Sequence, residues 1–385
     1  MHAYLKSICS IGRAGVRYES MNDLKMLLVL MLLIIPACTV PKNNSAGKIC
    51  ASCDIQPDQV VRLSKVQPPL DGEQRPLVYD HDGALDDYHA LVVASQLPHY
   101  ALRAATVVCG ESILSKNGID DASRATWQIL SLLGQADVPV GANTVCGRNH
   151  FPEAFRAVIE PVVNLPIFRE VTTTPPKLRD AGELLAETIR ASSVPVTILA
   201  AGPLTTIRDI LRDEPSLRGN IAEIVIMGGA LRVDGNTIMQ KPQVADMSAE
   251  FNFFIDPPAT KAILESGLPI RIMPLDATNH VIITEDVIDN IGSGVGKPTQ
   301  IIKQILEIER TIIRKYIGLS LWDVLAAMSL ERPDLFTWER VGIRIETDNP
   351  KGGQIVEDPR SPHHVLIATA AKRAALIAFE KDLLR

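Results

Sequence analysis

The sequence has few aromatic residues, no block of basic residues and no wholly apolar run long enough to span a bilayer. Phe, Trp and Tyr make up 4% of its 385 residues, and the formal net charge is −6. Because proteins that bind nucleic acid present clustered Lys and Arg, this charge pattern does not indicate a nucleic-acid surface. The composition favours a small ligand, either neutral or bound together with a cation. With 46% hydrophobic residues, the chain can form one large domain or two ordinary ones.

Cysteine is also scarce, with six residues in the whole chain. Cys50 and Cys53 form a lone CxxC motif. No second Cys or His pair accompanies it, so a zinc site is not indicated, and a local disulfide is expected if the chain is exported. Cys109 and Cys146 stand beside apolar residues. We therefore predict that they are buried thiols rather than nucleophiles.

The N-terminal region has the pattern of an export signal. Residues 26–35 are wholly apolar and follow Lys25. These ten residues are too few to span a bilayer but suit the central part of a signal peptide. The sequence Ile-Pro-Ala-Cys at residues 35–38 resembles the bacterial lipoprotein box, although Pro36 departs from it. An apolar core helix is the alternative, but the run has no polar face. We expect an exported protein, periplasmic or anchored to the outer membrane through acylated Cys38.

The chain divides into three segments on this interpretation. Residues 1–38 are the signal peptide with its lipoprotein-like box. Residues 39–75 contain Pro, Asn, Lys and Gln without a sustained period, which is typical of a flexible tether. Residues 76–385 form the folded domain, in which no internal repeat is visible.

An acidic loop at residues 80–87 contains four Asp residues and no Lys or Arg. The apolar residues before it predict a buried strand, and the apolar residues after it predict a helix. Closely spaced carboxylates raise one another's pKa unless a positive charge lies among them. A hard divalent cation is the simplest such charge, because it prefers carboxylate and carbonyl oxygens. Helix capping would explain one or two of these residues, but not Asp80 and Asp82 at the strand end.

Strand and helix patterns alternate along the rest of the chain. Strands are predicted at residues 101–108, 138–140, 196–200, 221–227 and 270–275. This alternation with helices predicts an α/β fold with a mainly parallel sheet. Because ligands of open α/β sheets bind at the carboxyl ends of the strands, acidic residues far apart in sequence can converge there.

Other features of the domain are predicted from local signals. Residues 342–346 and 365–368 are expected to form a C-terminal strand pair. The Pro-rich segment 149–175 is expected to be an irregular rim. The paired Gly228 and Gly229 at a strand end indicate a close approach of the main chain to another group. The Asp-Pro-Pro sequence at residue 256 predicts the start of a helix.

Further motifs follow the acidic loop in a fixed order. They are Ala-Gly-Pro-Leu-Thr at 201–205, Ile-Met-Gly-Gly-Ala at 226–230, Gly-Asn at 235–236, Ala-Glu-Phe-Asn at 249–252, Asp-Pro at 256–257 and Trp-Asp-Val-Leu-Ala-Ala at 322–327. Residues 80–87 are similar to the signature Asp-x-Asp-Pro-Gly-x-Asp-Asp, with all four aspartates in register. Together these motifs resemble the inosine–uridine-preferring nucleoside hydrolase family over residues 76–340.

The resemblance implies a Rossmann-like core and a calcium-dependent N-glycosidase that hydrolyses ribonucleosides to free base and ribose. The residues that would hold Ca2+ are Asp82, Asp87, Asp323 and the carbonyl oxygen of Ala201. Asp82 would also be the base that takes a proton from the attacking water. The residues that would bind the substrate are Asp86, Met227, Asn236, Glu250, Asn252 and Trp322. The implied partner is a small ribonucleoside, the only membrane contact would be the N-terminal lipid anchor, and a homo-oligomer is possible.

The chain departs from the family pattern at three places. The Pro-Gly of the signature is Gly83-Ala84, and the ribose-contacting Asn after the second strand is Glu111. The His that often precedes the last aspartate, and that is implicated as the leaving-group acid, is Trp322. This last change implies a different contact with the nucleobase. Without the resemblance, Met227 and Trp322 could equally be core residues, and Asn236 and Asn252 turn residues.

Two alternative functions remain open from the sequence. Residues 80–85 also resemble the Asp-x-Asp-Gly-Thr-Leu motif of haloacid dehalogenase-like phosphatases, with Asp80 as nucleophile and Asp82 as acid/base. That motif's Thr is Ala84, however, and Asp86 and Asp87 would have no role. The other alternative is a non-catalytic surface lipoprotein that binds nucleosides or sugars, because a fold does not settle function.

Overall fold

The computed structural model describes residues 60–67, 72–315 and 319–385. The predicted signal peptide and lipoprotein box, and the predicted disulfide between Cys50 and Cys53, lie outside these ranges. No helix in the described ranges is both long enough and apolar enough to cross a membrane.

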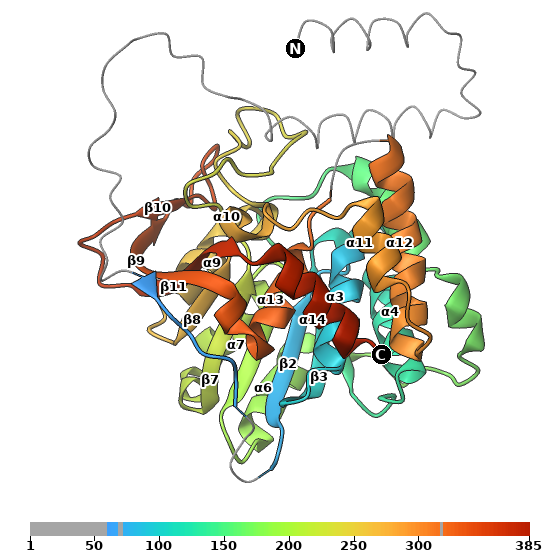
Figure 1. Ribbon diagram of the computed structural model, residues 1–385. Helices are drawn as coiled ribbons and strands as arrows, with labels where there is room; N and C mark the ends of the chain where they lie inside the picture. The colour runs from blue at the N-terminus through green and yellow to red at the C-terminus, as the bar shows by residue number, and fades with distance from the viewer. Residues whose placement is uncertain (1–59, 68–71, 316–318) are drawn as a thin grey trace, which may run out of the picture.

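An eleven-stranded sheet forms the centre of the molecule (Figure 1). Its order is β1-β9-β11-β8-β7-β6-β2-β3-β4-β5, and β10 pairs with β9. The run from β11 to β5 is parallel throughout, whereas β9 is antiparallel to its neighbours β11, β1 and β10. The strands are β1 (Val60–Val61), β2 (Arg75–His81), β3 (Tyr100–Cys109), β4 (Val140–Cys146), β5 (Arg179–Asp180), β6 (Val196–Ala201), β7 (Ile221–Met227), β8 (Ile270–Met273), β9 (Phe336–Ile345), β10 (Ile355–Glu357) and β11 (His364–Ala371).

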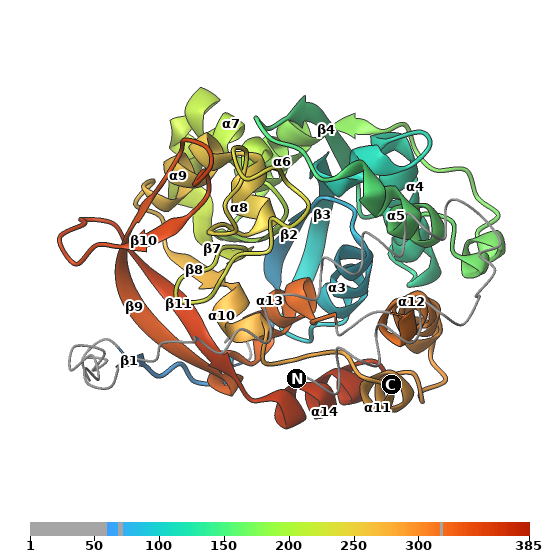
Figure 2. The same cartoon turned by 90° about the horizontal axis from the view of Figure 1, so that it is seen from above.

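Helices cover both faces of this sheet (Figure 2). The α-helices are α3 (Leu85–Ser95), α4 (Ile119–Leu132), α5 (Arg156–Val162), α6 (Ala181–Ala191), α7 (Thr205–Asp213), α8 (Phe251–Ile255), α9 (Pro257–Leu264), α10 (Leu275–Thr278), α11 (Glu285–Ile291), α12 (Lys297–Lys315), α13 (Trp322–Glu331) and α14 (Arg373–Leu383). The 3-10 helices are η2 (Glu111–Leu114), η3 (Glu153–Phe155), η4 (Pro166–Glu170), η5 (Pro215–Asn220) and η6 (Pro333–Leu335).

Two apolar cores lie between the sheet and its helices. The helices α6, α7 and α9 pack against one face, and α3, α4, α13 and α14 belong to the core on the other. The central strands are therefore covered on both sides, which explains why every residue of β6 is buried and apolar runs replace strict alternation. The prediction of an α/β fold with a mainly parallel sheet is confirmed.

Local signals account for several element boundaries. The carboxylate of Asp256 accepts a hydrogen bond from the Ala259 amide at 3.1 Å, and Pro257 occupies the first position of α9, as predicted. The C-terminal pair is confirmed as β9 and β11, which are antiparallel. The strand predicted at 138–140 instead begins at Val140 and continues to Cys146. It continues through polar residues because backbone pairing with β3 extends to Cys146.

Part of the segment predicted as a tether is packed on the domain. Val60 and Val61 form β1, which pairs with β9 at the edge of the sheet. The amide of Val66 donates a hydrogen bond to the carbonyl of Glu331 at 3.3 Å. Val61, Leu63 and Val66 are partly buried and pack against the core, so the tether boundary at residue 75 is corrected for residues 60–67.

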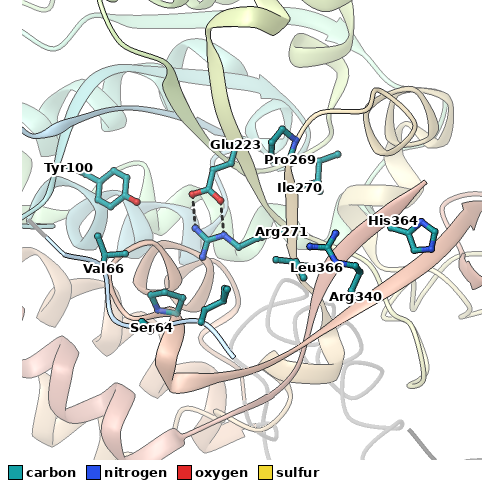
Figure 3. Close-up of a pocket in the computed structure, with 12 residues that line it drawn as sticks. Ser64, Val66, Tyr100, Glu223, Pro269, Ile270, Arg271, Arg340, His364 and Leu366 are labelled. Atoms are coloured by element: carbon teal, nitrogen blue, oxygen red, sulfur yellow. Dashed lines mark hydrogen bonds and ion pairs between the residues drawn. The ribbon is translucent and has the colours of Figure 1, made fainter. Parts of the chain in front are cut away.

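A cavity of about 370 Å³ lies where several parallel strands begin (Figure 3). It is lined by Tyr100 of β3, Glu223 of β7 and Arg271 of β8. The Arg271 guanidinium donates to both carboxylate oxygens of Glu223 at 2.8 Å, and to the Ser329 carbonyl at 3.0 Å. Arg271 and Glu223 at this amino end of the sheet are thus paired with each other.

Candidate active site

A second cavity, of about 560 Å³, lies at the carboxyl ends of the parallel strands. Four strands bring residues to it: Asp82 follows β2, Glu111 follows β3, Ala201 ends β6 and Met227 ends β7. Helix starts contribute the others, with Asp86 and Asp87 in the first turn of α3 and Asp323 in that of α13. Every residue assigned from the sequence lines this cavity: Asp82, Asp86, Asp87, Ala201, Met227, Asn236, Glu250, Asn252, Trp322 and Asp323.

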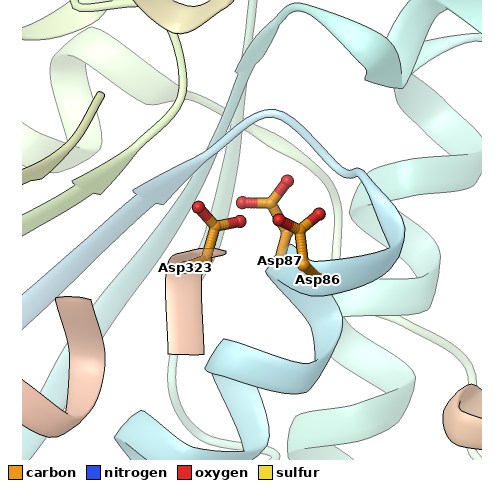
Figure 4. Close-up of side chains that lie close together, drawn as sticks. All are labelled: Asp86, Asp87 and Asp323. Atoms are coloured by element: carbon orange, nitrogen blue, oxygen red, sulfur yellow. The ribbon is translucent and has the colours of Figure 1, made fainter. Parts of the chain in front are cut away.

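Three of these carboxylates form a compact cluster (Figure 4). One oxygen from each of Asp86, Asp87 and Asp323 lies within 4.8 Å of the other two. Asp87 is fixed by the fold, because its Oδ1 accepts from the Tyr79 hydroxyl at 3.1 Å and its Oδ2 from the Ala84 amide at 2.7 Å. The side chain of Asp87 therefore both caps α3 and faces the other acids. Helix capping and a place in the acidic cluster can thus both account for an aspartate at this position.

Burial and mutual repulsion make this cluster electrostatically unfavourable by itself. Burial raises the pKa of Asp87 well above its usual range, and the charges of Asp323, Asp82 and Asp86 raise it further. Burial likewise raises the pKa of Asp82 to about 7. Among the described residues that line the cavity there is no Lys or Arg. A positive charge from outside the chain would remove the penalty.

The available ligand atoms suit a hard divalent cation. They are carboxylate oxygens and, at the end of β6, a main-chain carbonyl, which are the donors such cations prefer. Asp82 is 2% exposed, and its Oδ2 has no hydrogen-bond partner among the described residues. The predicted metal set contains Asp82 with Asp87 and Asp323, whereas the tightest cluster contains Asp86 in its place. An unpartnered Asp82 oxygen beside this cluster fits a cation that Asp82 also contacts.

The predicted ribose-binding residues are held by backbone hydrogen bonds. Glu250 caps α8: its Oε1 accepts from the Asn252 amide at 2.8 Å and its Oε2 from the Gly229 amide at 2.9 Å. Burial raises the pKa of Glu250 to about 7, and these hydrogen bonds oppose the rise. The Asn252 side-chain amide donates to the Met227 carbonyl at 3.2 Å. Asn236 accepts from the Phe251 amide at 2.9 Å. Their positions are thus set before any ligand arrives.

The paired glycines predicted to allow a close approach do so. A Cβ atom at Gly228 would lie 2.5 Å from the ring of Phe253. Gly229 has φ +83° and donates its amide to Glu250. Larger residues at these positions would displace Phe253, and with it the helix that carries Asn252.

The acidic loop itself differs in shape from the family signature. Gly83 has φ +80°, in the left-handed region that proline cannot adopt. The family's proline at this position is therefore incompatible with the present backbone. Glu111, in place of the family's Asn, adds a further acid to the cavity: burial and the charges of Asp82 and Asp86 raise its pKa well above its usual range.

The prediction of free thiols at Cys109 and Cys146 is wrong, because the two residues form a disulfide. Their apolar neighbours in sequence gave no sign of the pairing. It arises because adjacent parallel strands β3 and β4 end side by side, with these residues in register. The disulfide thus ties together the strand ends just before Glu111.

The remaining wall of the cavity was not predicted in detail. The rim segment contributes Phe151, Phe155 and Val158, and it contains η3, α5 and η4 rather than irregular chain alone. Phe151 stacks on Phe251 with ring centroids 4.7 Å apart. Helix α12 contributes Glu309 and Ile312. A signal for Glu309 existed, since it is a charged residue at helical spacing from Ile305 and Ile312 on an apolar face.

Comparisons with known proteins agree with this arrangement. The sequence matches the family described as inosine-uridine preferring nucleoside hydrolase over residues 77–378. The pyrimidine-specific ribonucleoside hydrolase RihA of Shewanella woodyi is 30% identical over 295 residues, which cover 74% of this chain and 88% of that protein. RihA of Escherichia coli O1:K1 / APEC is 30% identical over 278 residues, with 71% and 84% covered.

Solved structures give the same result. The inosine-uridine preferring nucleoside hydrolase of Bacillus anthracis is similar with a TM-score of 0.71 and 26% identity, covering 81% of this chain and 99% of that one. The plant nucleoside hydrolase PpNRh1 has a TM-score of 0.70 at 20% identity, covers 80% and 98%, and supports the fold alone. Since the family match spans well over half of the chain, this protein belongs to the inosine–uridine preferring nucleoside hydrolase family.

Proposed function

We propose that this protein hydrolyses the N-glycosidic bond of ribonucleosides to free base and ribose, with calcium as its cofactor. One observation carries the proposal: a buried acidic cluster, without a Lys or Arg among the described residues around it, lines the same cavity as a preorganised set of amide and carboxylate groups. The first is suited to a divalent cation and the second to the hydroxyls of a sugar. Calcium is preferred because the donors are all oxygens and several are available.

The residues of the cavity have distinct roles in this reaction. The ribose hydroxyls form hydrogen bonds with Asp86, Asn236, Glu250 and Asn252. Met227 packs beside the sugar. The buried carboxylates stabilise the positive charge that develops on the ribose as the bond to the base breaks. Asp82, whose Oδ2 is unpartnered, takes the proton of the attacking water.

The cation would be held by Asp82, Asp87, Asp323 and the Ala201 carbonyl. A cation bound there lowers the pKa of water in its coordination shell and thus supplies a nucleophile at neutral pH. Its charge would also keep Asp82 ionised, which the metal-free site opposes through burial.

The proposal is tested by assaying free ribose released from uridine, cytidine, inosine and adenosine, with 2′-deoxyuridine for comparison. Uridine and cytidine come first because two relatives by sequence are named pyrimidine-specific. The deoxynucleoside should react up to ~10^4-fold more slowly, because polar groups built for the hydroxyl are left unpaired. Asp82→Asn should lower kcat by about 10^2- to 10^4-fold.

Other outcomes would assign another function. Binding of ribonucleosides without ribose release would support a binding lipoprotein. Phosphate release from nucleotides without ribose release would support the phosphatase reading of residues 80–85. If Asp82→Asn is as active as the wild type, the protein is still a hydrolase, but another residue accepts the proton of the attacking water.

We further propose that the protein is exported and anchored through Cys38. The disulfide between Cys109 and Cys146 supports export, because such bonds persist mainly in oxidising compartments. A Cys38→Ser variant should leave the membrane fraction of the host cell. If that variant stays with the membranes as the wild type does, the lipid anchor is excluded.

A further inference from the structure

One part of the cavity is assigned to neither the cation nor the ribose. We call it the base wall, and its principal residues are Phe151, Phe155, Glu309, Ile312, Leu319 and Trp322. If the ribose is held by the acidic and amide groups, this wall is where the nucleobase is expected to lie. All members of the base wall are apolar or aromatic except Glu309.

Glu309 is an unusual residue for its position. It lies on α12 at helical spacing from Ile305 and Ile312, which are buried, and it is itself 1% exposed. Its Oε2 has no hydrogen-bond partner in the described part of the chain. A buried and unpartnered carboxyl group is costly when ionised, so it favours the protonated form.

Glu309 forms no ion pair with a basic side chain among the described residues. The charged groups that act on it are Asp86 and His89 of α3 and Glu380 of α14. The His89 Nε2 is already engaged with Glu380 at 2.5 Å. The neighbouring Arg310 points to other partners, at 2.6 Å from Asp289 and 3.1 Å from Glu285 of α11. In the other elements packed on α12, Arg156 of α5 pairs with Glu160 of the same helix, and Glu170 of η4 pairs with Lys297 of α12.

We propose that Glu309 is the acid that protonates the leaving nucleobase. This assignment rests on the proposed function. Where other members of the family carry the His implicated in that role, this chain has Trp322, whose indole N–H can donate a hydrogen bond but does not release a proton. Burial raises the pKa of Glu309 to about 8, His89 opposes that rise, and Asp86 and Glu380 add to it. The group is therefore protonated at neutral pH.

The other acids that line the cavity are placed differently. Burial and the charges of Asp82 and Asp86 raise the pKa of Glu111, so Glu111 interacts with the acidic groups and not with the base wall. Asp234 lies exposed on the loop after β7. Among the described residues of the base wall, Glu309 alone carries a transferable proton at neutral pH.

In the proposed hydrolysis, one proton moves from Glu309 to the nucleobase and another from water to Asp82. The bond between the ribose C1′ and the base nitrogen breaks, and its electron pair stays on the base. The base takes the Glu309 proton and leaves as a neutral molecule. Water forms the new bond to C1′ and gives its proton to Asp82. Glu309 regains a proton from solvent and Asp82 returns one, so the net reaction consumes one water.

The test compares two leaving groups in a Glu309→Gln variant. Gln keeps the shape of Glu and its capacity to form hydrogen bonds, but it has no proton to transfer. With uridine or inosine, kcat should fall about 10^2-fold or more. With 4-nitrophenyl β-D-ribofuranoside, whose leaving group departs as a stable anion, kcat should change less than about threefold. The exposed Glu307→Gln, on the same helix, is the matched control and should match the wild type with both substrates.

A pH profile of the wild type gives a second readout that needs no variant. With a ribonucleoside, kcat/KM should decline above about pH 8, and this decline should be absent with the nitrophenyl riboside. Equal losses with both substrates in Glu309→Gln, or no loss with either, would overturn the assignment. If the wild type releases ribose from none of the substrates, the proposed function itself fails.

Discussion

The two ends of the same parallel sheet treat buried charge in opposite ways. At the amino end, Arg271 pairs with Glu223 through two hydrogen bonds and lies over the ring of Trp338 at 5.6 Å. At the carboxyl end, Asp82, Asp86, Asp87 and Asp323 gather, and no Lys or Arg lines their cavity in the part of the chain that the structure describes. Both ends are polar and concave, and both draw their residues from the ends of neighbouring strands.

The difference distinguishes a structural pair from a binding site. Buried polar groups are normally satisfied within the protein, and an exception indicates that something else satisfies them. Perturbed acids gathered in a cleft are typical of functional sites. Arg271 and Glu223 pair with each other in the cavity of Figure 3, whereas the described residues that line the cavity of the three aspartates in Figure 4 include no Lys or Arg.

The largest expected effect comes from removing one charge at the carboxyl end. Asp87→Asn keeps the size of the side chain but removes a negative charge from the proposed cation site. Because charge stabilisation by a metal is worth several kcal/mol, ribose release should fall at least about 10^3-fold. Calorimetry should show calcium binding lost as well. The exposed Asp213→Asn should retain both properties, and calcium binding by Asp87→Asn as tight as that of the wild type would contradict the metal assignment.

Removing the charge at the amino end should affect stability instead of activity. Arg271→Met leaves Glu223 without its partner, which for a largely buried pair costs about 3 kcal/mol of unfolding free energy. Denaturant unfolding measures this change. At a temperature where the variant is folded, its kcat should stay within about twofold of the wild type, because Arg271 does not line the candidate active site and should not contact the transition state. A loss of activity without a loss of stability would contradict the structural role assigned to this pair.

A smaller effect should appear in the pH dependence of stability without calcium. Burial raises the pKa of Asp82 and Glu250 to about 7 and of Asp86 to about 6. The folded protein therefore binds more protons than the unfolded chain above about pH 4, and its stability falls as the pH rises towards 7.

Calcium should reverse this trend, because it replaces the protons. At a calcium concentration a hundredfold above Kd, the gain is about 2.7 kcal/mol. Thermal unfolding with and without calcium at pH 5 and pH 8 measures it, and the gain should be larger at pH 8. An equal gain at both values would mean that the cation binds elsewhere.

The sequence was most informative where neighbouring residues carry the signal. The acidic loop joins β2 to α3 within a few residues, so its strand, its helix and its four aspartates could be predicted together. The convergence of Glu250 and Asp323 on the same cavity followed from the expectation of a parallel sheet, and their places within it came from the family resemblance.

Features that depend on pairing across the fold could not be predicted in this way. Cys109 and Cys146 meet because two strands end in register, and neither sequence neighbourhood shows this. Residues 60–67 looked like a tether because two residues of strand have no period. Glu309 was overlooked because a single Glu on an amphipathic helix is usually exposed; its spacing from Ile305 and Ile312 placed it on the apolar face, but its burial and its missing partner are visible only in the structure.

The acids at the carboxyl end are proposed to hold the cation on which hydrolysis depends. The most direct measurement is ribose release from a ribonucleoside by chelator-treated protein during a titration with calcium. Activity should be near the background without the cation and should rise to its maximum as one equivalent binds, with no such rise in Asp87→Asn. Full activity of the cation-free protein would contradict the account.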